Sequence, residues 1–587
     1  MRRKIGRILA WIGGITVGLV ALTILSVVLL SGEDPVPDQV ILEINLEQGV
    51  AEYVPEDPFA KLISDDVRSL RDVVGALDAA ASDDRVVGLL ARGGGAAMGF
   101  AQAQEIRDAV LDFGKSGKPT AIFAETFGEF GAGNVGYYLA TAFERIYLQP
   151  SGDVGLMGLA MEHPFVKGTL DSLGIGVQMD HRYEYKNAMN LYTETKFTDA
   201  HRQASEALLK SMVDQMVLGI SQARGTTPEA VRDFINRGPF LALSAHAEGL
   251  VDSLAYWDEV HGLVKREHGE DTKWLDIKNY LKRIDEKPYG EGTKVALIYG
   301  VGPVLRGKSA YDPLYGSATM GATTLTKAFR DAVKDKDVRA ILFRIDSPGG
   351  SYVASDAIWR EVAKAKKADK PVVVSMGNVA GSGGYFVAMN ADKIVAQPGS
   401  ITGSIGVLAG KFVTTEFWER LGITWDTAQV GENALIWGTG AEFTPEQWAK
   451  FQTWLDRIYE DFTAKVAEGR DMSQADVHAV AKGRIWTGED AKAHGLVDEL
   501  GGMKTAMSLI REALELEADA SLNLVVFPKE KTLIEQVMEK GLIRTLSRDD
   551  ALERLTTELQ PVFHFARTVR QPRQVLEMTP MDIRLDE

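Results

Sequence analysis

Short apolar runs typical of strands alternate along the chain with runs of helical pattern. Val295–Gly300 ("VALIYG") and Ala340–Ile345 ("AILFRI") have the length and composition of strands buried on both faces. Other stretches carry apolar residues at the helical spacing i, i+3, i+4 and i+7, as at Leu70, Val73, Val74 and Leu77. Because strands joined by helical crossovers pair in parallel, this alternation predicts an α/β fold.

One apolar stretch does not fit this alternation. Residues 8–30 form 23 consecutive residues without a charge, and four Lys or Arg residues precede them. A helix of this length spans a hydrocarbon core of about 30 Å. A cleaved signal peptide would have a shorter apolar region ending in an Ala-x-Ala-like site, which this sequence lacks. We therefore expect residues 1–32 to form a cytoplasmic basic stub and an uncleaved transmembrane helix, with the rest of the chain across the membrane.

The sequence beyond this segment repeats itself once. Gly136–Gly155 aligns with Gly384–Gly403 at an offset of 248 residues, and Gly249–Val260 aligns with Gly495–Ala506 at an offset of 246. The strand-like run that begins at Val86 aligns with the one at Val338, 252 residues later. We therefore predict two related domains at residues 33–285 and 290–530, a polar linker near Lys282–Lys294, and a helical or irregular tail at residues 531–587.

Composition narrows the classes of function. The formal net charge of −17, with no basic stripe among aromatic residues, argues against a nucleic-acid surface. The absence of cysteine excludes thiol catalysis, disulfides and cysteine-ligated zinc, and it suits an oxidising compartment. We expect no cofactor and no metal.

The two repeats differ at positions that matter for chemistry. Ser382, in "GNVAGSGGYFVAMNA", aligns with Asn134, and Ser404 aligns with Leu156. Conversely, Lys186 of the first repeat aligns with Glu432 of the second. Each repeat therefore holds residues that the other lacks, as expected either for one site assembled from both repeats or for chance divergence.

Ser382 follows an apolar strand pattern and precedes a helical one, a turn at which a serine oxygen can project from the fold. A tight turn of small residues would give the same pattern. The segment "SPGG" that holds Gly349 and Gly350 adds unhindered backbone N–H groups before a helix, and such groups stabilise an oxyanion.

A serine nucleophile needs a base, which could be His, Asp or Lys. The histidines after Ser382 are in contexts typical of surface residues: His478, His494 and His564. A lysine base requires its pKa to fall by roughly three units from about 10.4, and burial among apolar groups has that effect. A second hydroxyl such as that of Ser404 would then orient the neutral amine.

Together, the N-terminal anchor, the two repeats, "SPGG", "SGGY", "TGSIG" and "YKNA" resemble the long tandem form of bacterial signal peptide peptidase A, also called protease IV. The resemblance covers about residues 5–527. It implies two ClpP/crotonase-like domains, and it assigns roles to individual residues. The nucleophile would be Ser382, the general base Lys186 and the residue that orients the lysine Ser404, with an oxyanion hole from Gly349, Gly350 and Gly383.

The "YKNA" segment departs from the family, which usually has serine where this chain has Asn187. The difference puts in doubt a local hydrogen bond from this position, but not the role of Lys186.

The resemblance also implies a function: a membrane-anchored serine endopeptidase that degrades remnant signal peptides and other apolar unfolded peptides. It would be a homotetramer in the bacterial inner membrane, anchored through residues 8–30, with a cytoplasmic N-terminus and a periplasmic catalytic domain. Two alternatives remain, a crotonase-like acyl-CoA enzyme and a catalytically silent, ring-forming membrane scaffold. The sequence leaves open whether Lys186 and Ser382 meet within one chain or between subunits.

Overall fold

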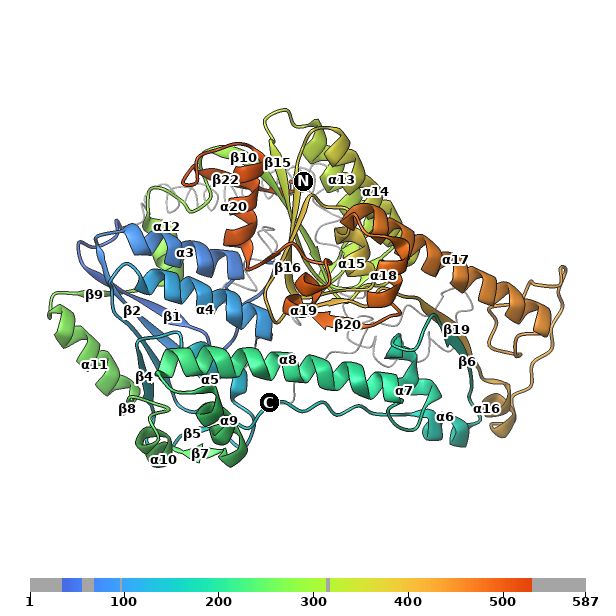
Figure 1. Ribbon diagram of the computed structural model, residues 1–587, viewed down its shortest axis with the longest axis horizontal. Helices are drawn as coiled ribbons and strands as arrows, with labels where there is room; N and C mark the ends of the chain where they lie inside the picture. The colour runs from blue at the N-terminus through green and yellow to red at the C-terminus, as the bar shows by residue number, and fades with distance from the viewer. Residues whose placement is uncertain (1–33, 55–67, 96–97, 313–316, 530–587) are drawn as a thin grey trace, which may run out of the picture.

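The computed structural model describes residues 34–54, 68–95, 98–312 and 317–529. These residues form two α/β units, each built on a mainly parallel sheet with helices packed against it (Figure 1). The α/β class and the two parallel-sheet units predicted from the sequence are therefore confirmed.

The first unit contains a six-stranded parallel sheet in the order β8-β4-β3-β2-β1-β9. Its strands are β1 (Val40–Asn45), β2 (Val86–Gly93), β3 (Thr120–Ala124), β4 (Arg145–Leu148), β8 (Ser253–Leu254) and β9 (Lys273–Asp276). Its helices include α3 (Leu70–Ser82), α4 (Phe100–Gly114), α5 (Asn134–Ala140), α9 (Pro228–Arg237), α10 (Ala242–Ala247), α11 (Trp257–His268) and α12 (Ile277–Arg283). The short strands β5 (Asp153–Val154) and β7 (Phe240–Leu241) pair beside it.

Helix α3 shows how the pattern sets the packing. The hydroxyl of Ser69 accepts a hydrogen bond from the N–H of Asp72 and so caps the start of the helix. The apolar residues that the sequence placed on one helical face are all buried in the core: Leu70, Val73, Val74 and Leu77.

The second unit contains an eight-stranded sheet with the path β20-β18-β16-β15-β10-β22, and β17 joins β16 to β21. All pairs are parallel except β18 with β20. Its strands are β10 (Thr293–Val301), β15 (Ala340–Ser347), β16 (Val372–Gly381), β17 (Lys393–Ala396), β18 (Ile401–Gly403), β20 (Ile485–Thr487), β21 (Glu499–Leu500) and β22 (Leu522–Phe527). The short strands β11 (Val304–Leu305), β12 (Tyr311–Asp312), β13 (Ser317–Ala318) and β14 (Met320–Gly321) pair outside it. Its helices are α13 (Ala322–Lys334), α14 (Tyr352–Lys367), α15 (Gly383–Ala388), α16 (Thr415–Arg420), α17 (Pro445–Arg470), α18 (Gln474–Val480), α19 (Gly488–Ala493) and α20 (Met503–Ala513).

Two elements join the units in a way that the sequence analysis did not predict. Strand β6 (Gly176–His181) of the first repeat pairs antiparallel with β19 (Leu408–Val413) of the second. The long helix α8 (Asp199–Arg224) runs along both units (Figure 1) and meets β20, where the Ser211 and Thr487 hydroxyl oxygens are 2.9 Å apart. Helix α6 (Lys167–Leu173) precedes β6 in the chain, and η1 (Asn187–Met189) and α7 (Asn190–Thr193) lie between β6 and α8.

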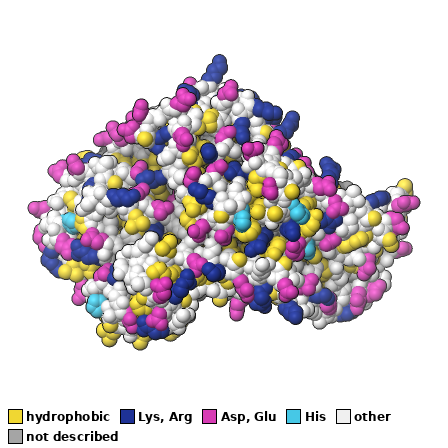
Figure 2. All heavy atoms as spheres, viewed as in Figure 1, with side chains coloured by type: hydrophobic (Ala, Val, Ile, Leu, Met, Phe, Trp, Pro, Cys, Tyr) yellow, Lys and Arg dark blue, Asp and Glu magenta, His cyan; other side chains and the backbone are white. Residues whose placement is uncertain are grey.

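Within the part of the chain that the structure describes, no helix is long and apolar enough to cross a membrane. The predicted anchor at residues 8–30 and the predicted tail at residues 531–587 lie outside the described residues. On the face in Figure 2, Lys and Arg side chains are dispersed among Asp and Glu side chains.

Candidate active site

Ser382 occupies the sharp turn between β16 and α15. Its backbone has φ 52° and ψ −116°, a conformation uncommon for a residue with a side chain. The N–H of Ser382 donates to the carbonyl of Gly403 at 2.9 Å, which ties the turn to the end of β18. The side chain remains partly exposed. This strand–turn–helix geometry presents the hydroxyl at the carboxyl end of the sheet.

Lys186 of the first repeat lies against this turn within the same chain. Its Nζ is 2.9 Å from the Oγ of Ser382, 2.8 Å from the carbonyl oxygen of Ser404 and 2.9 Å from the Oγ of Ser404. The two serines of the second repeat that have no counterpart in the first, Ser382 and Ser404, therefore both contact the amine of Lys186. Ser404 has a positive φ of 50°, which turns its carbonyl and its hydroxyl toward the same nitrogen.

The environment of Lys186 lowers its basicity. The residue is only 6% exposed, and no carboxylate of the described residues forms an ion pair with it. Burial lowers its pKa to about 7, because the ammonium form loses its hydration and has no negatively charged partner within the described part of the chain to compensate for the loss. A large share of the amine is therefore unprotonated near neutral pH.

A short segment of the second unit holds the lysine in place. The carbonyl of Lys482 accepts a hydrogen bond from Tyr185, and the N–H of Gly483 donates to Ile405 at 2.8 Å. A Cβ on Gly483, which has φ 83°, would lie 2.5 Å from the backbone nitrogen of Lys186. Only glycine permits this approach, so the lysine backbone packs directly against Gly483, which in turn is hydrogen-bonded to Ile405.

The glycine-rich loop after β15 supplies free donors beside Ser382. The N–H of Gly349 donates to the Oγ of Ser347 at 3.2 Å, whereas the N–H groups of Gly350 and Gly383 have no acceptor among the described residues. A Cβ on Gly349 would lie 2.6 Å from the nitrogen of Gly383, so the loop and the turn are in close contact. Two unpaired N–H groups next to a serine hydroxyl can receive an oxyanion.

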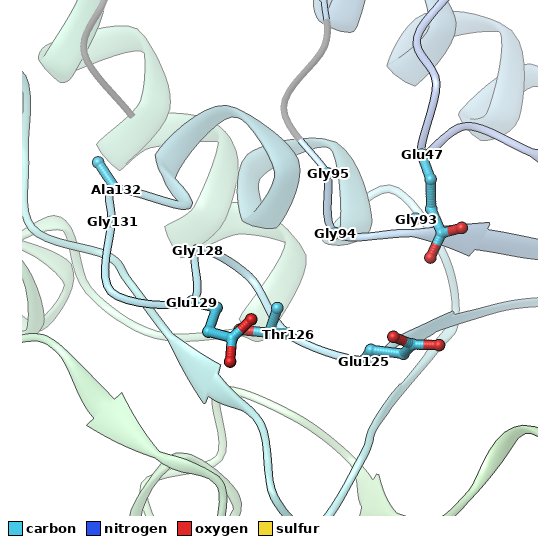
Figure 3. Close-up of a pocket in the computed structure, with 10 residues that line it drawn as sticks. All are labelled: Glu47, Gly93, Gly94, Gly95, Glu125, Thr126, Gly128, Glu129, Gly131 and Ala132. Carbon is cyan, nitrogen blue, oxygen red and sulfur yellow. The ribbon is translucent and has the colours of Figure 1, made fainter.

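In the first unit, the residue that aligns with Ser382 is Asn134, and its side chain binds backbone groups of the fold. Asn134 is buried, and its amide donates to the carbonyl of Gly158 and accepts from the N–H groups of Met157 and Gly158. Nearby is a cavity of about 340 Å³ lined by glycines and three glutamates, Glu47, Glu125 and Glu129 (Figure 3). The asparagine therefore offers no nucleophilic hydroxyl at the place of Ser382.

The other predicted positions lie elsewhere. The Nδ1 of His478 is 2.9 Å from the hydroxyl of Tyr459, and the His494 ring packs on Trp486, so neither hydrogen-bonds to Ser382; both are half-buried rather than surface residues. His564 is outside the described residues. Glu432 is exposed, and the buried Oδ1 of Asn187 has no hydrogen-bond partner. The described residues contain no cluster of three His, Asp or Glu side chains suited to a metal ion.

Known proteins similar to this chain match both of its units. The model of peptidase family S49 matches residues 112–269 and 364–517, one stretch in each unit. The chain is 31% identical over 487 residues to the chloroplastic serine protease SPPA of Arabidopsis thaliana, covering 82% of this chain and 71% of that protein. It is 31% identical over 499 residues to protease 4 of Salmonella typhi, covering 81% and 77% respectively. A putative signal peptide peptidase SppA of Enterococcus faecium is 34% identical over 183 residues, 31% of this chain and 53% of that protein.

Proposed function

The chain belongs to peptidase family S49 and is a serine peptidase, and we propose that it cleaves peptides with Ser382 as nucleophile and Lys186 as general base. The observation that carries the proposal is the 2.9 Å separation of Lys186 Nζ and Ser382 Oγ, around an amine that is buried without a counter-ion. Serine–lysine pairs are a known variant of nucleophile activation.

The contacts of Lys186 fit a neutral amine, which has two N–H groups and one lone pair. The two N–H groups donate to the carbonyl and the hydroxyl oxygen of Ser404. The lone pair then faces Ser382 and accepts its hydroxyl hydrogen. In this role Ser404 orients the base.

Acylation then follows in two steps. Lys186 takes the hydroxyl proton as the Oγ of Ser382 bonds to the peptide carbonyl carbon, and the carbonyl π electrons move to its oxygen. When this tetrahedral intermediate collapses, the C–N bond breaks and the leaving amine takes the proton from the Lys186 ammonium. The free-amine fraction of Lys186, and with it the rate, falls as the pH drops below about 7.

Hydrolysis of the acyl-enzyme uses the same groups. Lys186 removes a proton from water, whose oxygen attacks the acyl carbon, and the C–O bond to Ser382 breaks as the serine regains a proton from the lysine. Gly350 and Gly383 would donate their N–H groups to the oxyanion in both halves of the reaction. Gly349 contributes through its conformation, with φ 103°, since its own N–H is bonded to Ser347.

The finer assignments are also proposals. We propose that each unit is a ClpP/crotonase-like domain, and that the substrates are remnant signal peptides and other apolar unfolded peptides. The similarity to a putative signal peptide peptidase of Enterococcus faecium supports signal peptides as substrates. Residues 8–30 would anchor the protein in the bacterial inner membrane, with the catalytic units in the periplasm as a homotetramer; the uncharged length of this segment supports the anchor.

Replacing Lys186 by Met tests the proposal. We expect cleavage of an unfolded, signal-peptide-like substrate to fall by at least about 1,000-fold, because the serine loses its base. Labelling by a fluorophosphonate, which reports a nucleophilic serine, should fall in parallel, and Ser382→Ala should abolish it. Circular dichroism and size-exclusion chromatography check that both variants remain folded and assembled. Cleavage by Lys186→Met at the wild-type rate would refute the dyad, and labelling that persists in Ser382→Ala would refute the nucleophile.

A further inference from the structure

The strand that leads to Ser382 contains a bulge. Strands β15 and β16 pair in register at Ile345 and Met376, and the next pair is Ser347 with Ala380. Asp346 therefore stands alone opposite three residues, Gly377–Val379. Bulges of this kind change the direction of a strand and are frequent beside active sites.

The side chain of Asp346 fills the gap that this bulge creates. Its Oδ1 accepts a hydrogen bond from the N–H of Val379 at 2.9 Å. A Cβ on Gly377 would lie 3.1 Å from the Cβ of Asp346, so the bulge packs directly over this side chain. The carboxylate thus holds a backbone group that the interrupted ladder leaves without its usual partner.

This carboxylate stands between the two halves of the candidate site. Asp346 directly precedes the segment Ser347–Gly350, which carries one of the two free N–H groups. Val379 is three residues before Ser382, which carries the hydroxyl. One side chain therefore links the oxyanion loop to the nucleophile strand, and a shift of either alters the distance between them.

The first repeat shows that the fold does not need this carboxylate. At the offset of 252 residues, Asp346 aligns with Gly94, which has φ 107°. A Cβ on Gly94 would lie 2.1 Å from the carbonyl oxygen of Thr126, so no side chain fits there. The aspartate is present in the repeat that has Ser382 and absent from the repeat that has Asn134.

The bulge is also braced from the first unit. The Oδ1 of Asn378 accepts a hydrogen bond from the N–H of Gln102 at 3.1 Å, at the start of α4. The Oε2 of Glu52 accepts from the Nε2 of Gln102 and would lie 3.3 Å from a Cβ on Gly377. The bulge is therefore held between a carboxylate of its own unit and polar groups of the other.

We propose that Asp346 is a positioning residue for the peptidase reaction, whose ionised carboxylate holds the Gly377–Val379 bulge so that Ser382 faces both Lys186 and the N–H of Gly350. The inference rests on the function proposed above and assigns to this aspartate a part in it. Asp346 acts through the backbone and touches no substrate.

Charged and titratable groups surround Asp346. Glu52 approaches from the first unit and Arg344 from the same strand, and the guanidinium of Arg344 also binds Glu105 of α4. Burial, followed by the negative charge of Glu52, raises the pKa of Asp346 to about 7, against the opposing effect of the Val379 N–H and Arg344. Protonation removes the negative charge that faces the bulge N–H.

Two deprotonations therefore favour activity over the same pH range. Lys186 must lose its proton to act as the base, and Asp346 must lose its proton to hold the bulge. We expect log(kcat/KM) of the wild-type protein to rise with a slope above 1 over about one pH unit just below pH 7, because both groups change protonation state in that range. Asp346→Asn, which keeps an acceptor oxygen but cannot ionise, should reduce this slope to about 1.

The variant should also lower the rate at its optimum. We expect kcat of Asp346→Asn to fall about 10-fold and that of Asp346→Ala about 100-fold, with KM nearly unchanged, because the reacting groups are misplaced while the substrate contacts remain. Asp392→Asn is the matched control, since Asp392 accepts the N–H of Val372 at 2.8 Å at the opposite end of β16. Its kcat and its slope should equal those of the wild type.

Several results would overturn the inference. A wild-type slope of about 1 does so without any variant, as does an Asp346→Asn protein whose kcat and slope match those of Asp392→Asn. If Asp346→Ala does not fold, the asparagine variant and the wild-type slope still decide the matter. Failure of the underlying function is distinguishable, because Ser382→Ala would then retain turnover whatever the Asp346 variants do.

Discussion

A residue without a side chain sets how closely the two units approach at Lys186. Gly483 lies between Lys186 and Ile405, and its positive φ and its lack of Cβ are both needed there. The energetic cost of a side chain would come from collision with backbone atoms, which cannot rotate away as a flexible side chain does.

Gly483→Ala tests this close approach. The added Cβ would meet the backbone of Lys186 at 2.5 Å, so we expect the lysine to be displaced and kcat/KM to fall by about 100-fold. Gly422→Ala is the matched control, because Gly422 has a similar φ of 72° but no atom within 4 Å of its Cβ position. Both variants carry the strain of a positive φ, and only the first carries the collision. Equal kcat/KM for the two variants, measured with the same peptide, would contradict this account.

The sequence identified the residues with reactive groups in the candidate site more fully than the residues that hold those groups in position. Comparison of aligned positions in the two repeats identified Ser382, Lys186 and Ser404, because those residues differ while the fold around them is shared. The same comparison could have identified Asp346, which aligns with a glycine, Gly94, in the first repeat. Gly483 also differs, because it aligns with Arg237 at the offset of 246 residues, but its importance arises from a contact between segments almost 300 residues apart in the chain.

Among the elements, the pair β6 and β19 carries Lys186 to the second unit. Strand β6 ends at His181, and the N–H of Arg182 donates to the carbonyl of Val407 at 2.8 Å. The guanidinium of Arg182 donates to the carbonyl of Gln452 at 2.8 Å and pairs with Asp456, both on α17. Arg182 thus fastens the end of β6 four residues before the lysine.

Arg182→Ala should loosen this attachment. We expect kcat to fall about 10-fold, because the amine samples positions away from Ser382, while the melting temperature changes little. Arg420→Ala is the control: Arg420 also joins the repeats, through the carbonyl of Ser172, but on α16, away from the Lys186 segment. Peptide turnover and thermal melts of both variants check the prediction. If Arg420→Ala lost kcat to the same extent, the loss would come from contacts between the repeats in general rather than from Arg182 in particular.

The pairing of β6 with β19 could not be predicted from periodicity. The sequence of β6, "GVQMDH", alternates apolar Val177 and Met179 with polar residues, but it is short, and its partner begins more than 220 residues later. The alternation of long, buried strands and amphipathic helices predicted the two sheets, because those patterns are local. Pairing of a strand of one unit with a strand of the other depends on how the units dock, which neither repeat encodes by itself.

For the molecule as a whole, two aligned arginines show how one repeat was adapted to hold the other. Arg344 has no exposed surface and binds Glu52 and Glu105 of the first unit, as well as the hydroxyl of Ser375 at 2.7 Å. Arg92, at the same position of the first repeat, is 31% exposed and pairs with Glu47 and Glu125 of its own unit. The same side chain is therefore a contact between units in one repeat and a surface ion pair in the other.

Replacing the two arginines separately measures this difference. Arg344→Met should leave two buried carboxylates without a cation and lower the free energy of unfolding by about 3–5 kcal/mol. Arg92→Met should cost at most about 1 kcal/mol, because water solvates the glutamates that it leaves behind. Denaturant midpoints and melting temperatures of the two variants give the comparison. Adding Glu52→Leu and Glu105→Leu to Arg344→Met should recover part of the loss, since Asp346 is then the one carboxylate of the described residues near Arg344 that stays buried without it. A similar loss in Arg92→Met, or no recovery in the triple variant, would show that the buried ion pairs do not hold the units together.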